Sequence, residues 1–252
     1  MNFNGKVVLV TGASRGIGRA CARMFAEHGA RVAIHYNSSR AAAEETFRGL
    51  AGSGHLLVQA EIGDAEAVRR MVDAVVEQSG RLDILVNNAG IFEEHALDQV
   101  SYEEWQTTVA RIVRTNLIGA SNVTYCAAQQ MIRQGGGRII SVSSRTAFRG
   151  KPEAPLYAAS KAALNAMSQS LAVALAPYGV YIGVVAPGVV ATEMATLDLA
   201  GPLGDSIRNQ SSMGRVAEPE EVAYTVLFLA SEGAEFLTGA IVDINGASYL
   251  RS

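Results

Sequence analysis

The sequence predicts an α/β fold, in which helices cover both faces of a doubly wound parallel sheet of about seven strands. Short apolar runs rich in β-branched residues recur along the 252-residue chain and alternate with longer stretches of helical pattern. Parallel strands need crossover connections, which those helical stretches can supply. Hydrophobic residues make up 49% of the chain and the mean hydropathy is +0.16, which is enough to bury both faces of such a sheet.

Seven apolar runs are expected to form the strands, with right-handed crossovers between them. They cover residues 7–10, 32–34, 56–58, 84–86, 138–142, 181–185 and 241–244. A helix is expected over 19–28 and is closed by Gly29 as a C-terminal cap, and a late helix begins at Pro219. No repeat, low-complexity tract or linker interrupts the pattern, so residues 1–252 are expected to form a single domain.

The turn after the first strand has the composition of an anion-binding site. It reads Thr11-Gly12-Ala13-Ser14-Arg15-Gly16-Ile17-Gly18. Glycines let the backbone approach a pyrophosphate, and the free N–H groups and dipole of the following helix favour its charge. The spacing differs from the Gly-x-Gly-x-x-Gly fingerprint, and a tight turn that needs positive φ would also explain the glycines. Three glycines in seven residues directly after a strand favour the anion site.

Polar or turn-forming residues follow the ends of several expected strands. Gly12, Asn88, Ser144 and Pro187 each fall just beyond a different strand. Doubly wound sheets bind their ligands at the carboxyl ends of the strands, near the switch in strand order. We therefore expect these four positions to converge on one site.

Tyr157 and Lys161 are four residues apart in Tyr157-Ala158-Ala159-Ser160-Lys161, so one turn of helix places the phenol and the ammonium on one face. A nearby cation stabilises phenolate and lowers the tyrosine pKa from about 10 toward the range of a general acid/base. Ser144 lies thirteen residues upstream (157 − 144) and could hydrogen-bond the same reacting oxygen. An aromatic edge beside a solvated charge would share this spacing, but the glycine-rich turn favours the catalytic interpretation.

Charge and segment composition argue against several classes of function. The net charge is −3 with no long basic run, so no nucleic-acid partner and no membrane surface is expected. No leader-like start is present and no stretch approaches about 18 apolar residues, so a soluble cytoplasmic protein is expected. Cys21 and Cys126 both fall in helical stretches and are expected to be reduced, and no metal site is expected.

Taken together, these residues resemble the single-domain branch of the short-chain dehydrogenase/reductase family, and its 3-oxoacyl-acyl-carrier-protein reductases in length and layout. The cofactor turn of that family, Thr-Gly-x-x-x-Gly-x-Gly, fits the first turn, and further motifs follow in order. The matching positions are Thr11, Gly12, Gly16, Gly18, Asn87-Asn88-Ala89-Gly90, Asn116, Ser144, Tyr157, Lys161, Pro187-Gly188 and Thr192. The matches run from residue 6 to about residue 246, which is nearly the whole chain.

The resemblance implies a Rossmann-like nucleotide-binding and catalytic domain that interconverts a ketone and a secondary alcohol by hydride transfer. In that reading, Tyr157 is the general acid/base and Ser144 hydrogen-bonds the substrate oxygen. Lys161 lowers the Tyr157 pKa and binds the nicotinamide ribose, and Asn116 anchors a water that relays protons from Lys161. A homo-oligomer, either a tetramer or a dimer, is also implied.

NADP(H) is expected rather than NAD(H), because no carboxylate follows the second strand before Glu44, and Arg15 and Arg40 could meet a 2′-phosphate. The residues expected to bind the cofactor come from the glycine-rich turn and from the ends of later strands. They are Gly12, Ser14, Arg15, Gly16, Ile17, Gly18, Asn37, Asn88, Ala89, Gly90, Tyr157, Lys161, Pro187, Gly188 and Thr192.

The sequence does not identify the substrate. The alternatives are an NAD(P)-dependent alcohol, sugar or steroid dehydrogenase and, in another class, a non-catalytic nucleotide-binding regulator. Residues 193–213 are irregular and are expected to form either a substrate lid or an ordinary surface loop. Substrate contacts are expected from Glu94, His95, Arg145, Phe148 and Val189.

Several positions depart from the family pattern. Glu61 stands where an Asp is usual near the adenine, and Trp105 to Asn116 is about one helical turn longer than usual. Arginines that flank the site in carrier-protein reductases align with Gly135 and Tyr178, neither of which is basic; Arg133, two residues away, is the alternative cation, and Arg138 lies at the start of the strand. Activity on small ketones or thioester mimics is therefore expected to equal or exceed activity on carrier-linked 3-oxoacyl chains.

Overall fold

The computed structural model describes residues 1–193 and 195–251, so Met194 of the expected lid and the final Ser252 lie outside the described residues. Seven parallel strands form one sheet in the order β3-β2-β1-β4-β5-β6-β7, which confirms the predicted fold class. The strands are β1 (Val7–Val10), β2 (Arg31–Tyr36), β3 (Leu56–Gln59), β4 (Ile84–Asn87), β5 (Gly137–Val142), β6 (Val180–Pro187) and β7 (Ile241–Ile244).

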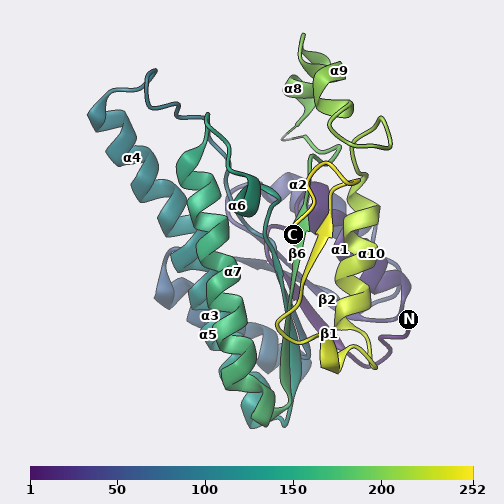
Figure 1. The fold of residues 1–252 in the computed structure, drawn as a ribbon. Coiled ribbons are helices and arrows are strands. Elements are labelled where there is room, and N and C mark those ends of the chain that lie inside the picture. Colours follow the sequence, from purple (N-terminus) through teal and green to yellow (C-terminus); the bar gives the residue numbers. More distant parts are fainter. Residues whose placement is uncertain (194, 252) are drawn as a thin grey trace.

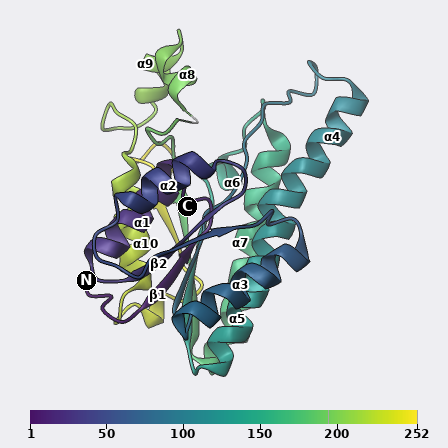
Figure 2. The same ribbon diagram turned by 180° about the vertical axis from the view of Figure 1, so that it is seen from behind.

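Helices cover both faces of the sheet (Figures 1 and 2). The α-helices are α1 (Gly16–Glu27), α2 (Arg40–Arg48), α3 (Ala65–Ser79), α4 (Tyr102–Val113), α5 (Ala120–Arg133), α6 (Thr146–Arg149), α7 (Pro155–Leu175), α8 (Thr196–Ala200), α9 (Gly204–Arg208) and α10 (Pro219–Ala230). Helices α1, α2 and α10 lie on one face, and α3, α5 and α7 lie on the other, with α4 packed against α7. Helix α1 begins three residues earlier than expected (19 − 16), directly in the glycine-rich turn.

The central strand β1 shows why apolar, β-branched runs build this fold. All four of its residues are buried, and successive side chains point to opposite faces of the sheet. Val8 and Val10 join the core beneath α1 and α10, whereas Val7 and Leu9 join the core beneath α3 and α5. The chain runs outward from β1 to β3 and then returns to β4 on the other side of β1, so the strand order switches between β1 and β4. A ligand crevice is expected at the carboxyl end of this switch.

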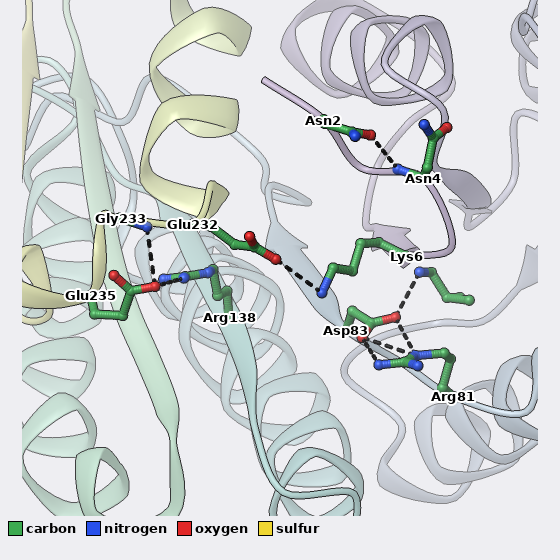
Figure 3. Close-up of polar contacts among 10 residues, drawn as sticks. Asn2, Asn4, Lys6, Arg81, Asp83, Arg138, Glu232, Gly233 and Glu235 are labelled. Atoms are coloured by element: carbon green, nitrogen blue, oxygen red, sulfur yellow. Dashed lines mark hydrogen bonds and ion pairs between the residues drawn. The ribbon is translucent and has the colours of Figure 1, made fainter.

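The opposite, amino-terminal end of the sheet carries charges that are paired with one another (Figure 3). Asp83 accepts a hydrogen bond from the backbone N–H of Val7 at 2.8 Å and also binds the guanidinium of Arg81. Arg138, at the start of β5, pairs with Glu235. Each of these arginines is therefore paired with a carboxylate at this end of the sheet.

Two features distinguish the carboxyl end. Helices α4 and α5 are joined by a π-helical turn, η1 (Arg114–Gly119), so the chain stays helical from 102 to 133. Helices α8 and α9 belong to the segment 193–213 and stand apart from the sheet, beyond the strand ends (Figure 1). Within the described residues, no helix is long and apolar enough to cross a membrane.

Candidate active site

The glycine-rich turn is held in a conformation that requires glycine. Gly12 and Gly16 have φ values of +65° and +53°, which side chains rarely adopt. A Cβ atom at Gly18 would lie 2.3 Å from the carbonyl oxygen of Gly12, so this glycine lets the helix start pack against the turn. The same turn lies close to Ala89, whose Cα would be 2.9 Å from a Cβ at Gly12. The absence of side chains at these glycines thus lets the turn, the start of α1 and the loop after β4 pack closely together.

His35 fixes this turn, a role that the sequence analysis missed. Its Nδ1 accepts the backbone N–H of Gly12 at 3.0 Å, and its Nε2 lies 3.0 Å from the carbonyl oxygen of Ala60. These partners require the neutral tautomer that carries its proton on Nε2, and burial lowers the pKa of His35 accordingly. The only signal in the sequence was a polar residue directly after the apolar run 32–34.

The loop after β4 is tied to the glycine-rich turn by Asn88. Its Nδ2 donates to the carbonyl oxygens of Thr11 and Gly12 at 2.9 and 3.1 Å. In return, the Thr11 hydroxyl accepts the backbone N–H groups of Asn88 and Ala89 at 2.9 and 3.0 Å. The carboxyl ends of β1 and β4 therefore form one rigid wall of the crevice.

Ser144, Tyr157 and Lys161 meet at the carboxyl end of β5. Lys161 is buried and donates to the carbonyl oxygen of Val142 at 2.9 Å, while its Nζ lies 5.7 Å from the centroid of the Tyr157 ring. The half-buried Tyr157 ring packs edge-on against Phe92 with the centroids 5.1 Å apart. The spacing of four residues thus places the phenol and the ammonium side by side, as the helical pattern predicts.

The pKa values of this group follow from burial. Burial raises the pKa of the Tyr157 phenol, and hydrogen bonding by Ser144 lowers it in part. Burial also lowers the pKa of Lys161 to about 8. Desolvation, and not Lys161, is thus the main influence on the Tyr157 pKa in this structure, and it acts upward, opposite to the direction expected from the sequence. The phenol therefore stays protonated at neutral pH, as a proton donor must.

Asn116 lies in the π-helical turn η1 and is buried. Its side chain pairs with both backbone groups of Ile91, accepting from N–H at 2.8 Å and donating to C=O at 3.0 Å. It also donates to the Ser160 hydroxyl at 3.1 Å, on the helix that carries Tyr157. In this structure the amide of Asn116 thus holds the loop after β4 against α7.

One cavity of about 1060 Å³ connects the glycine-rich turn with the Ser144–Tyr157–Lys161 group. Most positions expected to bind the cofactor line it, together with the catalytic candidates Ser144, Tyr157 and Lys161. The lining members of the cofactor set are Gly12, Ser14, Arg15, Gly16, Ile17, Asn37, Asn88, Ala89, Gly90, Tyr157, Lys161, Pro187, Gly188 and Thr192. Gly18 and Asn116 do not line it, because each packs behind the cavity wall.

At the end of the cavity nearest β2 and β3, the side chains are mostly neutral. Asn37 donates to a Glu61 carboxylate oxygen at 2.9 Å, so the acid that departs from the family pattern is engaged by an amide. Arg15 is exposed and lines the cavity. Arg40 does not line it and is paired with Glu44 at 2.8 Å, so its expected contact with a cofactor phosphate is not supported.

The structure corrects two of the expected substrate contacts. Glu94, Arg145 and Val189 line the cavity, but His95 and Phe148 do not. His95 is buried, and its Nε2 accepts the backbone N–H of Leu156 at 3.1 Å, so it anchors the start of α7 beside Tyr157. Phe148 lies beneath the guanidinium of Arg251 at 4.3 Å.

Comparison with known proteins agrees with this geometry. A family model described as enoyl-(acyl carrier protein) reductase matches residues 12–247. A 3-oxoacyl-acyl-carrier-protein reductase of Staphylococcus aureus is 38% identical over 247 residues, covering 97% of this chain and 98% of that protein. An uncharacterized oxidoreductase of Thermotoga maritima is 39% identical over 255 residues, covering 98% of this chain and 99% of that protein.

Solved structures show the same architecture. A 3-ketoacyl-(acyl-carrier-protein) reductase from Brucella melitensis, complexed with NADH, has a TM-score of 0.89 and 30% identity, covering 99% of this chain and 100% of its own. A short-chain dehydrogenase from Burkholderia cenocepacia, in complex with NADP, has a TM-score of 0.87 and 35% identity, covering 98% and 99%. The chain therefore belongs to the short-chain dehydrogenase/reductase family of oxidoreductases.

Proposed function

We propose that the chain is an NADPH-dependent reductase that converts a ketone into a secondary alcohol. The observation that carries this proposal is that Ser144, Tyr157 and Lys161 line the same cavity as the glycine-rich turn. Two hydroxyl groups at one point suit a carbonyl oxygen, which accepts two hydrogen bonds. The relatives from Staphylococcus aureus and Brucella melitensis are named as reductases of this kind.

The residues around the cavity fit a nicotinamide dinucleotide. The turn between Gly12 and Gly18 leaves its backbone open to a pyrophosphate at the start of α1, and Pro187-Gly188 and Thr192 form the facing wall. A bound nicotinamide would supply the hydride, while the protein supplies position and electrostatics. Lys161 lines the same cavity beside the Tyr157 ring and would bind the nicotinamide ribose.

Tyr157 would donate its proton to the substrate oxygen, and Ser144 would hold that oxygen in place. The raised pKa of the phenol keeps this proton available at neutral pH. In the reverse reaction the deprotonated form of Tyr157, the phenolate, would accept the proton of an alcohol. Asn116 would position the loop after β4 against α7. In the proposed relay, a water held near Asn116 would pass protons between Lys161 and solvent, so that Tyr157 is reprotonated.

A preference for NADPH over NADH is proposed from the charges near β2. Arg15 lines the cavity there, and none of the neighbouring lining residues Asn37, Ser38 and Ser39 is acidic. The one carboxylate nearby, Glu61, is hydrogen-bonded to Asn37. A 2′-phosphate at the end of β2 would therefore meet the Arg15 guanidinium and the hydroxyl groups of Ser38 and Ser39.

We further propose that the segment 193–213 closes over the substrate. We also propose that the enzyme is cytoplasmic and forms a homo-oligomer. Exposed apolar side chains along the long helix from α4 to α5 support self-association, notably Tyr102, Ile118 and Tyr125. Free cysteines suit a reducing compartment. Light scattering of the purified protein tests the oligomeric state.

An activity panel tests the proposed function. Purified enzyme is mixed with NADPH and a range of ketones, or with NADP and the matching alcohols, and the nicotinamide absorbance is followed. Oxidation of NADPH by at least one ketone, lost in Tyr157→Phe, is the expected result. Absence of turnover with every ketone and alcohol would instead support a nucleotide-binding regulator.

A further inference from the structure

Arg145 is a buried cation without a described carboxylate partner, in the residue directly after Ser144. Its side chain is 7% exposed, yet the groups it contacts are neutral. It donates to the Ser248 hydroxyl at 2.5 Å and to the Gln210 amide oxygen at 2.9 Å. Among the described residues, no carboxylate oxygen lies within the 4.0 Å of an ion pair. Burying a charge without an opposite charge is costly.

A second arginine shares the same acceptor. Arg149 lies one helical turn further along, and its guanidinium donates to the same Gln210 oxygen at 3.0 Å. The positive charge of Arg149 and burial both lower the pKa of Arg145, with burial the larger cause. Two like charges are thus held around one neutral oxygen, where an anionic oxygen would bind both of them more strongly.

The other charges in the cavity do not neutralise this pair. Glu94 and Glu153 are both engaged by Lys151, each at 3.4 Å. The remaining acidic lining residues, Glu61 and Glu193, belong to the cofactor end, beside Asn37 and Gly16 respectively. The substrate end of the cavity therefore carries an excess of positive charge next to the group that would hold the carbonyl.

We propose that Arg145 and Arg149 bind the carboxylate of a short oxo acid, whose ketone is the group reduced. This inference rests on the proposed function and names its substrate class. Ser144, Arg145 and Arg149 line the same cavity, so a substrate whose ketone meets Ser144 would carry its anion toward the two arginines. Gln210 occupies the position of the carboxylate oxygen in this structure and belongs to the segment 193–213. Its displacement by substrate would couple anion binding to the position of that segment.

The proposal is tested with matched pairs of 2-, 3- and 4-oxo acids and their methyl esters, which differ in charge but share the ketone. The wild-type enzyme should show a kcat/KM at least about tenfold higher for one acid than for its ester, as a charge-assisted bond provides. Arg149→Gln, at an exposed position that folding tolerates, should lower this ratio by roughly tenfold. Arg145→Gln, checked for folding by circular dichroism, should lower it at least as far. Lys151→Gln removes a cation that already has carboxylate partners and should leave the ratio unchanged.

Three outcomes would overturn the proposal. The first is a wild-type kcat/KM that is about equal for acid and ester. The second is an acid-to-ester ratio of kcat/KM that neither arginine substitution changes. The third is a ratio that falls as far in Lys151→Gln as in the arginine variants. Preference for a phosphate-bearing or carrier-linked ketone over every oxo acid would also reject the carboxylate as the anion.

A binding experiment separates this proposal from the proposed function, because it needs no turnover. Thermal unfolding is measured with butanoate and with butanamide in the presence of NADPH. A rise in Tm with butanoate alone, reduced in Arg149→Gln, supports the anion site even if no ketone is reduced. Equal shifts for the two compounds would overturn the site and leave the ketone reductase standing.

Discussion

The ammonium of Lys161 donates to the carbonyl oxygen of Val142 at 2.9 Å, so the catalytic lysine candidate is anchored to the last residue of β5. This bond fixes the distance between the cation and the sheet, while the helix that carries Lys161 also carries Tyr157. The ammonium is buried among groups that do not neutralise it, and burial lowers its pKa from 10.5 to about 8. Protonation of Lys161 is therefore linked to folding.

The first prediction concerns stability and pH in the cofactor-free enzyme. Because the folded pKa of Lys161 is below the unfolded value, its contribution to stability is present above pH 10.5 and is lost as the pH falls through about 8. Relative to Lys161→Met, the wild type should gain free energy of unfolding as the pH rises across that window, on the order of 3 kcal/mol. Urea unfolding of both proteins measures the difference, and a difference independent of pH would contradict a buried, titrating Lys161.

The second prediction concerns the proton donor. Tyr157→Phe removes the hydroxyl but keeps the ring that packs against Phe92. General acid catalysis contributes about 10²–10⁴-fold, so kcat should fall by that order while NADPH still binds. Steady-state kinetics and a fluorescence titration with NADPH measure the two effects. Near-wild-type turnover would show that another group supplies the proton.

The third prediction concerns the choice of cofactor. Arg15→Ala should reduce the kcat/KM with NADPH by roughly tenfold or more, because a charge-assisted bond to phosphate is worth about 1.5–3 kcal/mol. The kcat/KM with NADH should change little, since NADH has no 2′-phosphate. Arg40→Ala is the matched control, because Arg40 is paired with Glu44 outside the cavity. A wild-type preference for NADH would refute the assignment.

The fourth prediction concerns the support of the glycine-rich turn. His35→Phe leaves the N–H of Gly12 without its acceptor, and an unsatisfied buried donor costs about 1–3 kcal/mol. Weaker NADPH binding and a lower Tm should follow together. His35→Gln retains an acceptor and should recover part of both losses, as calorimetric titration and thermal unfolding can measure. Unchanged NADPH affinity in His35→Phe would show that the turn holds its shape unaided.

The fifth prediction concerns carrier proteins. Gly135 and Tyr178, the positions where related carrier-protein reductases have arginines, present no positive charge to an acidic carrier. The kcat/KM for a small 3-oxoacyl thioester should therefore equal or exceed that for the carrier-linked chain. A strong preference for the carrier-linked chain that weakens with salt would restore fatty-acid synthesis as the role.

The sequence was sufficient to predict the sheet and the residues that line its carboxyl edge, because both depend on local pattern. Hydrophobic runs predicted every strand, and the spacing of Tyr157 and Lys161 predicted their common face. Contacts made between distant segments could not be predicted. His35 meets Gly12 and His95 meets Leu156 only after the sheet and α7 have assembled. The upward influence of burial on the pKa of Tyr157 could not be predicted for the same reason, since burial is a property of the whole fold.

The π-helical turn around Asn116 has a consequence for how this helix can change. A π turn holds one more residue than an α turn, so side chains before and after it follow separate registers. Helix α4 packs on α7 and α5 packs on the sheet, and each keeps its own packing partner across the turn. We expect that the chain tolerates insertion or deletion of residues at the start of α4, because the amide of Asn116 stays bound to Ile91. On this expectation, the π turn absorbs a change in the length of α4 without moving Asn116.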